Sequence, residues 1–223
     1  MEDKEKIAIE ALKYVENNSI VGLGTGSTAN FFIKHLALKT KKEKLNIHVV
    51  ASSTVSELEA NKHGLKLISI DLLEDIDLYV DGADEVTDDL NVLKGRGYDL
   101  VKEKLLAQSA KKFIVIADQS KHVSAIGEKY PIPIEVMKNS WRLTKKLLDR
   151  IGHGELRKNS AGDAFSISSA GNYILDYQFK EKDIKKLNEE ILSTPGVIET
   201  GIFYKITNLA LMITNGDIRI ISL

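Results

Sequence analysis

The 223-residue sequence contains no cysteine. This absence excludes a disulfide framework, a thiolate metal site and a cysteine nucleophile. The sequence also lacks an excess of charge of either sign, because 31 Lys and Arg face 32 Asp and Glu. No general electrostatic field therefore attracts the chain to nucleic acid or to an anionic membrane, and any anion must be bound by a local site. A small anionic ligand fits this composition better than a polymer does.

Long apolar runs are also missing. No stretch approaches the roughly 20 residues that a membrane-spanning helix needs. The first residues are charged and follow helical periodicity, with Ile7, Ala11 and Val15 four apart, and they lack the apolar core of a signal peptide. We therefore expect a cytoplasmic protein with no membrane partner. The five histidines form no HxxxH or HxH pair, which gives little support to a zinc site or a histidine-based triad.

In the first part of the chain, short apolar segments alternate with segments of helical periodicity. Several of the apolar segments would be buried on both faces, which is typical of a parallel sheet. The pattern predicts an α/β fold, a Rossmann-like parallel sheet with helices on both faces. The expected strands are 20–23, 46–52, 65–70, 78–81 and 113–117, and the expected helices after the first are 27–38, 54–63 and 97–111.

From about residue 131 the order of elements becomes βαββαβ, which predicts a small ferredoxin-like α+β domain. Its expected elements are strand 132–136, helix 140–151, hairpin strands 164–168 and 173–178, helix 182–192 and strand 197–203. Two last strands, 209–213 and 218–222, flank a turn at Asn215-Gly216, and we expect them to return to the first sheet. The predicted domains are residues 1–128 with 204–223, which form the Rossmann-like catalytic domain, and residues 129–203, which form the small domain.

The segment GLGTGST, residues 22–28, lies between a predicted strand and a predicted helix. Glycines allow backbone N–H groups to approach a ligand, and a helix start adds free donors and a partial positive charge, which suits a phosphate. Thr25, Ser27 and Thr28 add hydroxyl donors. The spacing is neither GxGxxG nor a P-loop, which disfavours a dinucleotide or a nucleoside triphosphate. The alternative is a tight turn with a Ser or Thr helix cap.

The segment YVDGADE, residues 79–85, ends a predicted apolar strand. Ligands of open parallel sheets bind at the carboxyl ends of strands, so Asp81 and Asp84 lie where they could handle hydroxyl protons. The alternatives are helix capping and a site for a hard cation such as magnesium. Glu85, with Asp88 and Asp89, is expected to belong to a solvated acidic loop.

Two further segments contain cations that could bind an anion. Lys94-Gly95-Arg96-Gly97 precedes a predicted helix and could bind an anion, although a surface turn with solvated cations has the same pattern. Lys121 follows the strand 113–117, which raises its interest above that of an ordinary solvated lysine.

Glu103 is the most informative single residue. Leu100, Leu106, Ala107 and Ala110 share its face of the predicted helix, so its carboxylate lies on an apolar stripe. Burial, and the like charge of Asp99 on the same face, would raise a carboxyl pKa toward that of a general base. The alternative is a glutamate paired with a lysine from elsewhere in the chain.

Taken together, GLGTGST, YVDGADEV, LKGRG and EKLLAQSAKKFIVIADQSK, in this order, resemble the ribose-5-phosphate isomerase type A family over nearly the whole chain. The resemblance implies an aldose-ketose isomerase of the pentose phosphate pathway that interconverts D-ribose 5-phosphate and D-ribulose 5-phosphate through an enediolate. It implies no cofactor, no metal, a phosphorylated pentose as ligand and a homodimer or homotetramer.

The resemblance also implies roles for individual residues. Glu103 would be the base, Asp81 and Asp84 would assist ring opening and hydroxyl proton transfer, and Lys94 would stabilise developing charge. The implied substrate-binding residues are Thr25, Gly26, Ser27, Thr28, Gly82, Ala83, Gly95, Arg96, Gly97, Lys121 and Lys4.

The chain departs from the family pattern at Arg96, where a KGGG-type loop has glycine, and at Tyr98-Asp99, where small residues are common. We expect Arg96 to point outward or to add a cation without abolishing activity. Two alternative functions stay open. A non-catalytic sugar-phosphate sensor of the same fold would not need Glu103 and Lys94, and a sugar-phosphate deaminase or lactonase would be expected to have a histidine near DGADE.

Overall fold

The computed structural model describes residues 2–222, which form two compact units. The first unit comprises Met1–Ala83, Lys102–His122 and Ile206–Leu223, and the second comprises Asp84–Val101 and Val123–Lys205. Residues 84–101 thus group with the second unit, whereas the prediction places them in the first domain. The domain limits given above stay a prediction. Within residues 2–222, no helix is both long enough and apolar enough to span a membrane.

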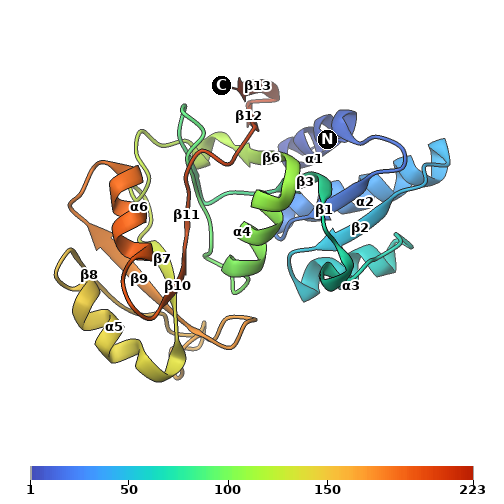
Figure 1. The fold of residues 1–223 in the computed structure, drawn as a ribbon. Helices are drawn as coiled ribbons and strands as arrows, with labels where there is room; N and C mark the ends of the chain where they lie inside the picture. Colours follow the sequence, from blue (N-terminus) through green and yellow to red (C-terminus); the bar gives the residue numbers. More distant parts are fainter. Residues whose placement is uncertain (1, 223) are drawn as a thin grey trace. The chain divides into compact units, whose positions relative to one another are not determined.

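A six-stranded sheet forms the centre of the first unit, with the order β13-β12-β6-β3-β1-β2 (Figure 1). All neighbouring strands are parallel except β13, which runs antiparallel to β12. The prediction of a parallel-dominated α/β sheet, with the closing hairpin added to it, is confirmed. The strands are β1 Ile20–Leu23, β2 His48–Ala51, β3 Ile76–Asp81, β6 Ala110–Asp118, β12 Leu209–Thr214 and β13 Asp217–Ser222.

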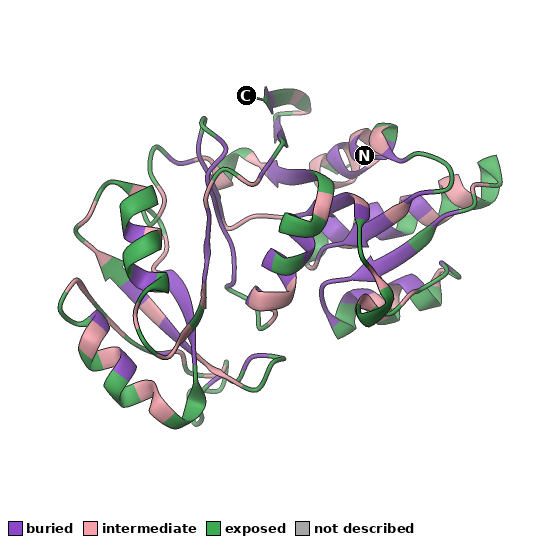
Figure 2. Ribbon diagram, viewed as in Figure 1, coloured by how far each residue is buried: buried purple, intermediate pink, exposed green. Residues whose placement is uncertain are grey.

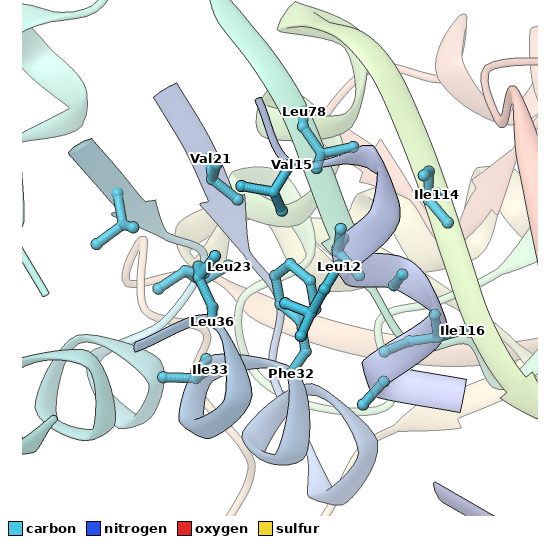
Figure 3. Packing of buried hydrophobic residues seen from close by; sticks show 14 of the residues in the cluster. Leu12, Val15, Val21, Leu23, Phe32, Ile33, Leu36, Leu78, Ile114 and Ile116 are labelled. Carbon is cyan, nitrogen blue, oxygen red and sulfur yellow. The ribbon is translucent and has the colours of Figure 1, made fainter. Parts of the chain in front are cut away.

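Helices α1 (Asp3–Ala11) and α2 (Ser27–Glu43) pack on the sheet through one apolar core (Figure 3). On α2, Phe32, Ile33 and Leu36 are fully buried, and their spacing of three to four residues puts them on one side of the helix. Alternate residues of the strands, such as Val21 and Leu23 of β1, complete this core. The inner strands β1, β3 and β12 are almost entirely buried, as their uninterrupted apolar runs predict, whereas the edge strand β13 is mostly exposed (Figure 2). Helix α3 spans Thr54–Lys62, and short 3-10 helices span Leu12–Tyr14, Ile70–Leu72 and Gln119–Lys121.

The second unit contains an antiparallel sheet with the order β10-β7-β9-β8. Helix α5 connects β7 to β8, and helix α6 connects β9 to β10. This is the βαββαβ connection of a ferredoxin-like domain, as predicted. A separate three-stranded sheet has the order β11-β5-β4. The elements are β4 Glu85–Val86, β5 Val92–Leu93, β7 Ile132–Val136, a 3-10 helix Lys138–Ser140, α5 Trp141–Leu148, β8 Gly152–Leu156, β9 Tyr173–Phe179, α6 Ile184–Leu192, β10 Val197–Thr200 and β11 Ile202–Phe203.

The predicted hairpin of strands 164–168 and 173–178 is wrong in its first strand. The partner of β9 is β8, and residues 164–168 contribute only isolated bridges such as Ile167 with Tyr173. Strand β8 contains Gly154, where a Cβ would lie 2.2 Å from the carbonyl oxygen of Asp176. The close approach of the two strands therefore requires glycine, which sequence patterns usually associate with loops.

Three further boundaries differ from the prediction. Residues 65–70 form no strand, because only an isolated bridge joins Leu67 to Val49. Helix α4 spans Leu100–Ser109 and not 97–111, since Ala110 and Lys112 already pair with β3. The expected strand 197–203 is divided between two sheets, as β10 and β11.

Glu85 is fully buried and does not belong to a solvated loop, so that expectation is wrong. Its carboxylate accepts the backbone N–H groups of Gly127 at 2.6 Å, Lys129 at 2.7 Å and Tyr130 at 2.8 Å. A buried carboxylate is tolerated when such donors replace its water, so Glu85 anchors the segment before β7. Asp88 and Asp89 are exposed as expected.

Candidate active site

Four loops of the first unit follow the carboxyl ends of parallel strands and therefore lie along one edge of the sheet. They follow Leu23 of β1, Ala51 of β2, Asp81 of β3 and Asp118 of β6. In open parallel sheets this edge binds ligands. The predicted residues of this unit lie in these loops or directly next to them, at the end of β3 and the start of α2, with the exceptions of Lys4 on α1 and Glu103 on α4.

The loop after β1 is shaped by its contact with Asp81. The N–H of Gly24 donates to the carbonyl of Val80 at 2.9 Å, and a Cβ on Gly24 would lie 2.1 Å from Asp81 Oδ1. Only glycine fits there. Gly26 has a φ of 114° and precedes α2, which begins at Ser27. The positive end of the α2 dipole thus opens at this loop, where it favours an anion.

Lys4 contributes a charge at the same helix start. Its Nζ donates to Ser27 Oγ at 3.0 Å. The charges of Lys121 and Lys4 also act on Asp118, the last residue of β6. Burial opposes the effect, but hydrogen bonds from Ser120 and these two cations hold the pKa of Asp118 below its ordinary value. The structure therefore brings Lys4 and Ser27 together, and Asp118 links both lysines electrostatically.

The side chain of Thr25 lies in a group of hydroxyls. Its Oγ1 is 3.0 Å from Ser52 Oγ, 2.6 Å from Ser53 Oγ and 3.0 Å from Ser56 Oγ. Ser56 Oγ also donates to the carbonyl of Gly24 at 2.6 Å, and all three serines are buried. These contacts of the three serines hold the loop after β1 in place. Sequence reasoning missed the serines, although Ser52 and Ser53 directly follow a strand and that position was a usable signal.

Asp81 is completely buried at the end of β3. Its Oδ1 accepts the N–H of Thr25 at 3.0 Å and of Gly82 at 2.7 Å, and its Oδ2 accepts the hydroxyl of Tyr79 at 2.5 Å. Asp81 thus joins the loops after β1 and β3. Gly82 and Ala83, which follow it, are half-buried.

Tyr79 is a second residue that sequence reasoning did not identify. It is 0% exposed and its ring stacks on Phe113, with ring centroids 5.1 Å apart. Burial, and then the negative charges of Asp81 and Glu103, raise the pKa of Tyr79 well above its ordinary value. Its hydroxyl therefore stays protonated and donates to Asp81.

The predicted burial of Glu103 is confirmed, because it is 7% exposed. Leu106 and Ala107 on the same helix are 1% and 2% exposed, as the apolar stripe predicts. The neighbouring Lys102 points to Glu57, with Nζ 3.3 Å from Oε1. The negative charge of Glu103 acts on Tyr79, as that of Asp81 does, and helps to raise the pKa of this phenol.

The remaining predicted residues belong to the second unit. Asp84 donates its N–H to the carbonyl of Leu93 at 2.9 Å, and its Oδ2 accepts the N–H of Arg96 at 3.3 Å. Lys94 is 4% exposed, so the alternative of a solvated surface cation does not hold for it. Its Nζ lies 6.0 Å from the centre of the Phe203 ring.

Arg96 and Gly97 are exposed, whereas Gly95 is buried with a φ of 92°. The guanidinium carbon of Arg96 lies 3.9 Å from the centre of the Tyr130 ring, which is a cation–π contact. The expectation that Arg96 is directed outward is confirmed. Within residues 2–222, no three His, Asp or Glu side chains gather into a group that could hold a metal ion.

Comparison of the sequence with known proteins gives one consistent result. The family described as ribose 5-phosphate isomerase A (phosphoriboisomerase A) matches residues 48–217. Ribose-5-phosphate isomerase A of Thermococcus kodakarensis is 40% identical over 221 residues, which cover 98% of this chain and 96% of that protein. The protein of the same name from Staphylococcus haemolyticus is 35% identical, with 100% of this chain and 99% of that protein covered.

Solved structures agree. Ribose 5-phosphate isomerase A of Methanocaldococcus jannaschii superposes with a TM-score of 0.93 at 34% identity, covering 99% of this chain and 98% of that one. A D-ribose-5-phosphate isomerase in complex with phospho-erythronic acid superposes with a TM-score of 0.94 at 37% identity, with the same coverage. That relative therefore holds a phosphorylated acid.

Proposed function

Because this chain belongs to the ribose 5-phosphate isomerase A family, we propose that its reaction is the interconversion of D-ribose 5-phosphate and D-ribulose 5-phosphate. It is an aldose-ketose isomerase of the non-oxidative pentose phosphate pathway. The phosphorylated ligand of the solved relative supports a phosphorylated pentose as its substrate. The observation that carries the catalytic assignment is the buried carboxylate of Glu103, whose negative charge, like that of Asp81, acts on the neutral phenol of Tyr79.

The isomerisation moves a hydrogen between two neighbouring carbons. Glu103 takes the proton from C2 of the open-chain aldose, which leaves an enediolate, and the protonated carboxyl then donates a proton to C1 to give the ketose. Lys94 stabilises the negative charge that develops on the enediolate oxygens. Asp81 and Asp84 assist ring opening and transfer hydroxyl protons. All of these steps are proton transfers or charge stabilisation, so the proposed reaction needs no redox cofactor.

The phosphate is assigned to the loop after β1. The start of α2, the residues Thr25 to Thr28 and the ammonium of Lys4 support this assignment, since helix N-termini and cations favour phosphate. Binding energy from the phosphate can then position the reacting carbons. The other residues assigned to substrate binding are Gly82, Ala83, Gly95, Arg96, Gly97 and Lys121.

A sugar-phosphate sensor of the same fold is the alternative function. It would require the loop after β1 but no base. Identities of 40% and 35% to isomerases over nearly the whole chain support the enzyme, as do the retained Glu103 and Lys94.

The test is an isomerase assay on ribose 5-phosphate in the presence of a chelator. We expect chelator-insensitive turnover in the parent and a loss of about 10³-fold in kcat for Glu103→Gln, because the amide cannot accept the proton. Glu189→Gln, on an exposed face of α6, is the matched control and should keep parental activity. Near-parental activity of Glu103→Gln would refute the assigned base.

The family also supports a homodimer or homotetramer in the cytoplasm as the working form. Light scattering of the purified chain should then give two or four times its monomer mass of 24.8 kDa. A monomer mass at micromolar concentration would contradict this part of the proposal.

A further inference from the structure

Arg157, directly after β8, is held rigidly inside the second unit. Its side chain is 12% exposed. Nε donates to Asp176 Oδ2 at 2.9 Å and Nη2 donates to Asp176 Oδ1 at 2.5 Å. This is a two-pronged guanidinium–carboxylate pair, the geometry that fixes an arginine most strongly. Asp176 lies in the middle of β9, so the pair is fastened to the sheet.

The remaining nitrogen of the guanidinium reaches the loop that contains Lys94. Nη1 donates to the carbonyl oxygens of Gly95 at 2.8 Å and Gly97 at 3.0 Å. Four of the five N–H donors of Arg157 are used by these contacts and the pair with Asp176. The guanidinium therefore binds other residues of the protein, and Arg157 is not among the residues assigned to substrate binding.

The consequence for Asp84 follows from the planarity of the peptide bond. In a trans peptide the C=O and the N–H point in opposite directions. When the Gly95 carbonyl faces Arg157, the N–H of Arg96 must face away from it, and this N–H donates to Asp84 Oδ2 at 3.3 Å. One continuous line of contacts thus runs from Asp176 through Arg157 and the Gly95–Arg96 peptide to Asp84.

We propose that Arg157 is a positioning residue of the isomerase, which sets the orientation of the Gly95–Arg96 peptide and, through it, of the Asp84 carboxylate. The proposal rests on the proposed function, because it gives Asp84 a task in the reaction. A cation on the carbonyl also polarises the peptide and strengthens its N–H as a donor to the carboxylate. Lysine cannot replace arginine there, since a single ammonium cannot hold Asp176 and both carbonyls in one plane.

The variants Arg157→Lys and Asp176→Asn test the proposal, with Arg150→Lys as the control at an exposed arginine of the same unit. We expect kcat to fall about 10- to 100-fold in Arg157→Lys, the size of effect that a small misplacement of a reacting group produces. KM should change less than kcat does, because the phosphate loop after β1 is untouched, although Gly95 to Gly97 are also assigned to substrate binding. Arg150→Lys should match the parent.

Rescue separates a positioning role from a merely structural one. Free guanidinium at low millimolar concentration should restore part of the kcat of Arg157→Ala, while the same salt leaves Arg157→Lys and the parent unchanged. In addition, Arg157→Lys should cause no further loss of kcat in an Asp84→Asn background, because both changes remove the same contribution.

A readout without activity keeps this inference separate from the proposed function. Amide hydrogen exchange of the peptide covering residues 94–99 should be faster in Arg157→Lys than in the parent, and unchanged in Glu103→Gln. Faster exchange with no isomerase activity in the parent would overturn the function while the contact stands. A lower melting temperature with parental kcat in Arg157→Lys, or multiplying losses with Asp84→Asn, would overturn the positioning role.

Discussion

Replacing Tyr79 with phenylalanine removes a single oxygen from the centre of the candidate site. The ring would keep its stacking on Phe113, whose centroid lies 5.1 Å away, so the packing of the sheet face is preserved. The change deletes the hydrogen bond to Asp81 Oδ2 at 2.5 Å. Asp81 is 0% exposed, so water cannot easily take the place of the phenol.

The expected cost follows from these contacts. A hydrogen bond to a charged group contributes about 1.5–3 kcal/mol. We therefore expect Tyr79→Phe to lower the free energy of unfolding by about 2 kcal/mol. For a chain of this size the melting temperature should fall by roughly 4–8 °C. We also expect kcat to fall about 10-fold, because Asp81 would lose the phenol that orients its Oδ2.

Urea unfolding followed by circular dichroism and the isomerase assay on the same preparation measure both quantities. Tyr204→Phe, at a half-buried tyrosine of the second unit, is the matched control and should change neither. If Tyr79→Phe were as stable and as active as the parent, the phenol would not be what holds Asp81, and the account of this group would be wrong.

Three further predictions concern the loop and the charges around it. Gly24→Ala should lower kcat by about 100-fold while the circular dichroism spectrum stays parental, because the new Cβ would lie 2.1 Å from Asp81 Oδ1 and must displace this carboxylate. Parental kinetics would contradict this contact. Lys4→Met should raise KM for ribose 5-phosphate about 10-fold with kcat nearly unchanged, since it removes a cation beside Ser27 at the phosphate loop; steady-state kinetics would reject the idea if KM stayed the same. Hydrogen bonds from Lys111 and from the N–H of Ile20 hold the pKa of Asp77 below its ordinary value. The contribution of ionised Asp77 to stability is therefore present above the unfolded pKa of about 3.9 and is lost as pH falls through the folded pKa. Asp77→Asn should therefore lose less stability than the parent between pH 5 and pH 3 in urea unfolding, and equal losses would contradict the ion pair.

Strand-end positions and helical periodicity in the sequence were enough to predict part of the candidate site. Glycines and polar residues after apolar strands identified the loop at 24–28, Asp81 and Lys121, because strand ends in parallel sheets converge on one edge. Helical periodicity predicted the burial of Glu103 correctly. The βαββαβ order similarly predicted the second unit.

Contacts between distant parts of the chain could not be predicted from such rules. Thr25 and Ser56 are 31 residues apart, and Arg157 and Gly95 are 62 residues apart, so no periodicity links them. The expectation that Glu85 is solvated was wrong because its acidic neighbours resemble a surface loop. In the structure, three backbone N–H groups from residues 127–130 donate to its buried carboxylate. The strand β8 was missed because glycines occupy the positions where it approaches β9 most closely.

The central claim is that Glu103 transfers a proton between two carbons of the sugar. The most direct measurement is the isomerisation of ribose 5-phosphate in D₂O, with the ribulose 5-phosphate formed examined by NMR. The account predicts that the parent places deuterium on C1 of the product, because the proton passes through a carboxyl group that exchanges with solvent, and that Glu103→Gln forms labelled product at least about 10³-fold more slowly. Full conversion by the parent with no deuterium at C1, or labelling by Glu103→Gln at the parental rate, would contradict it.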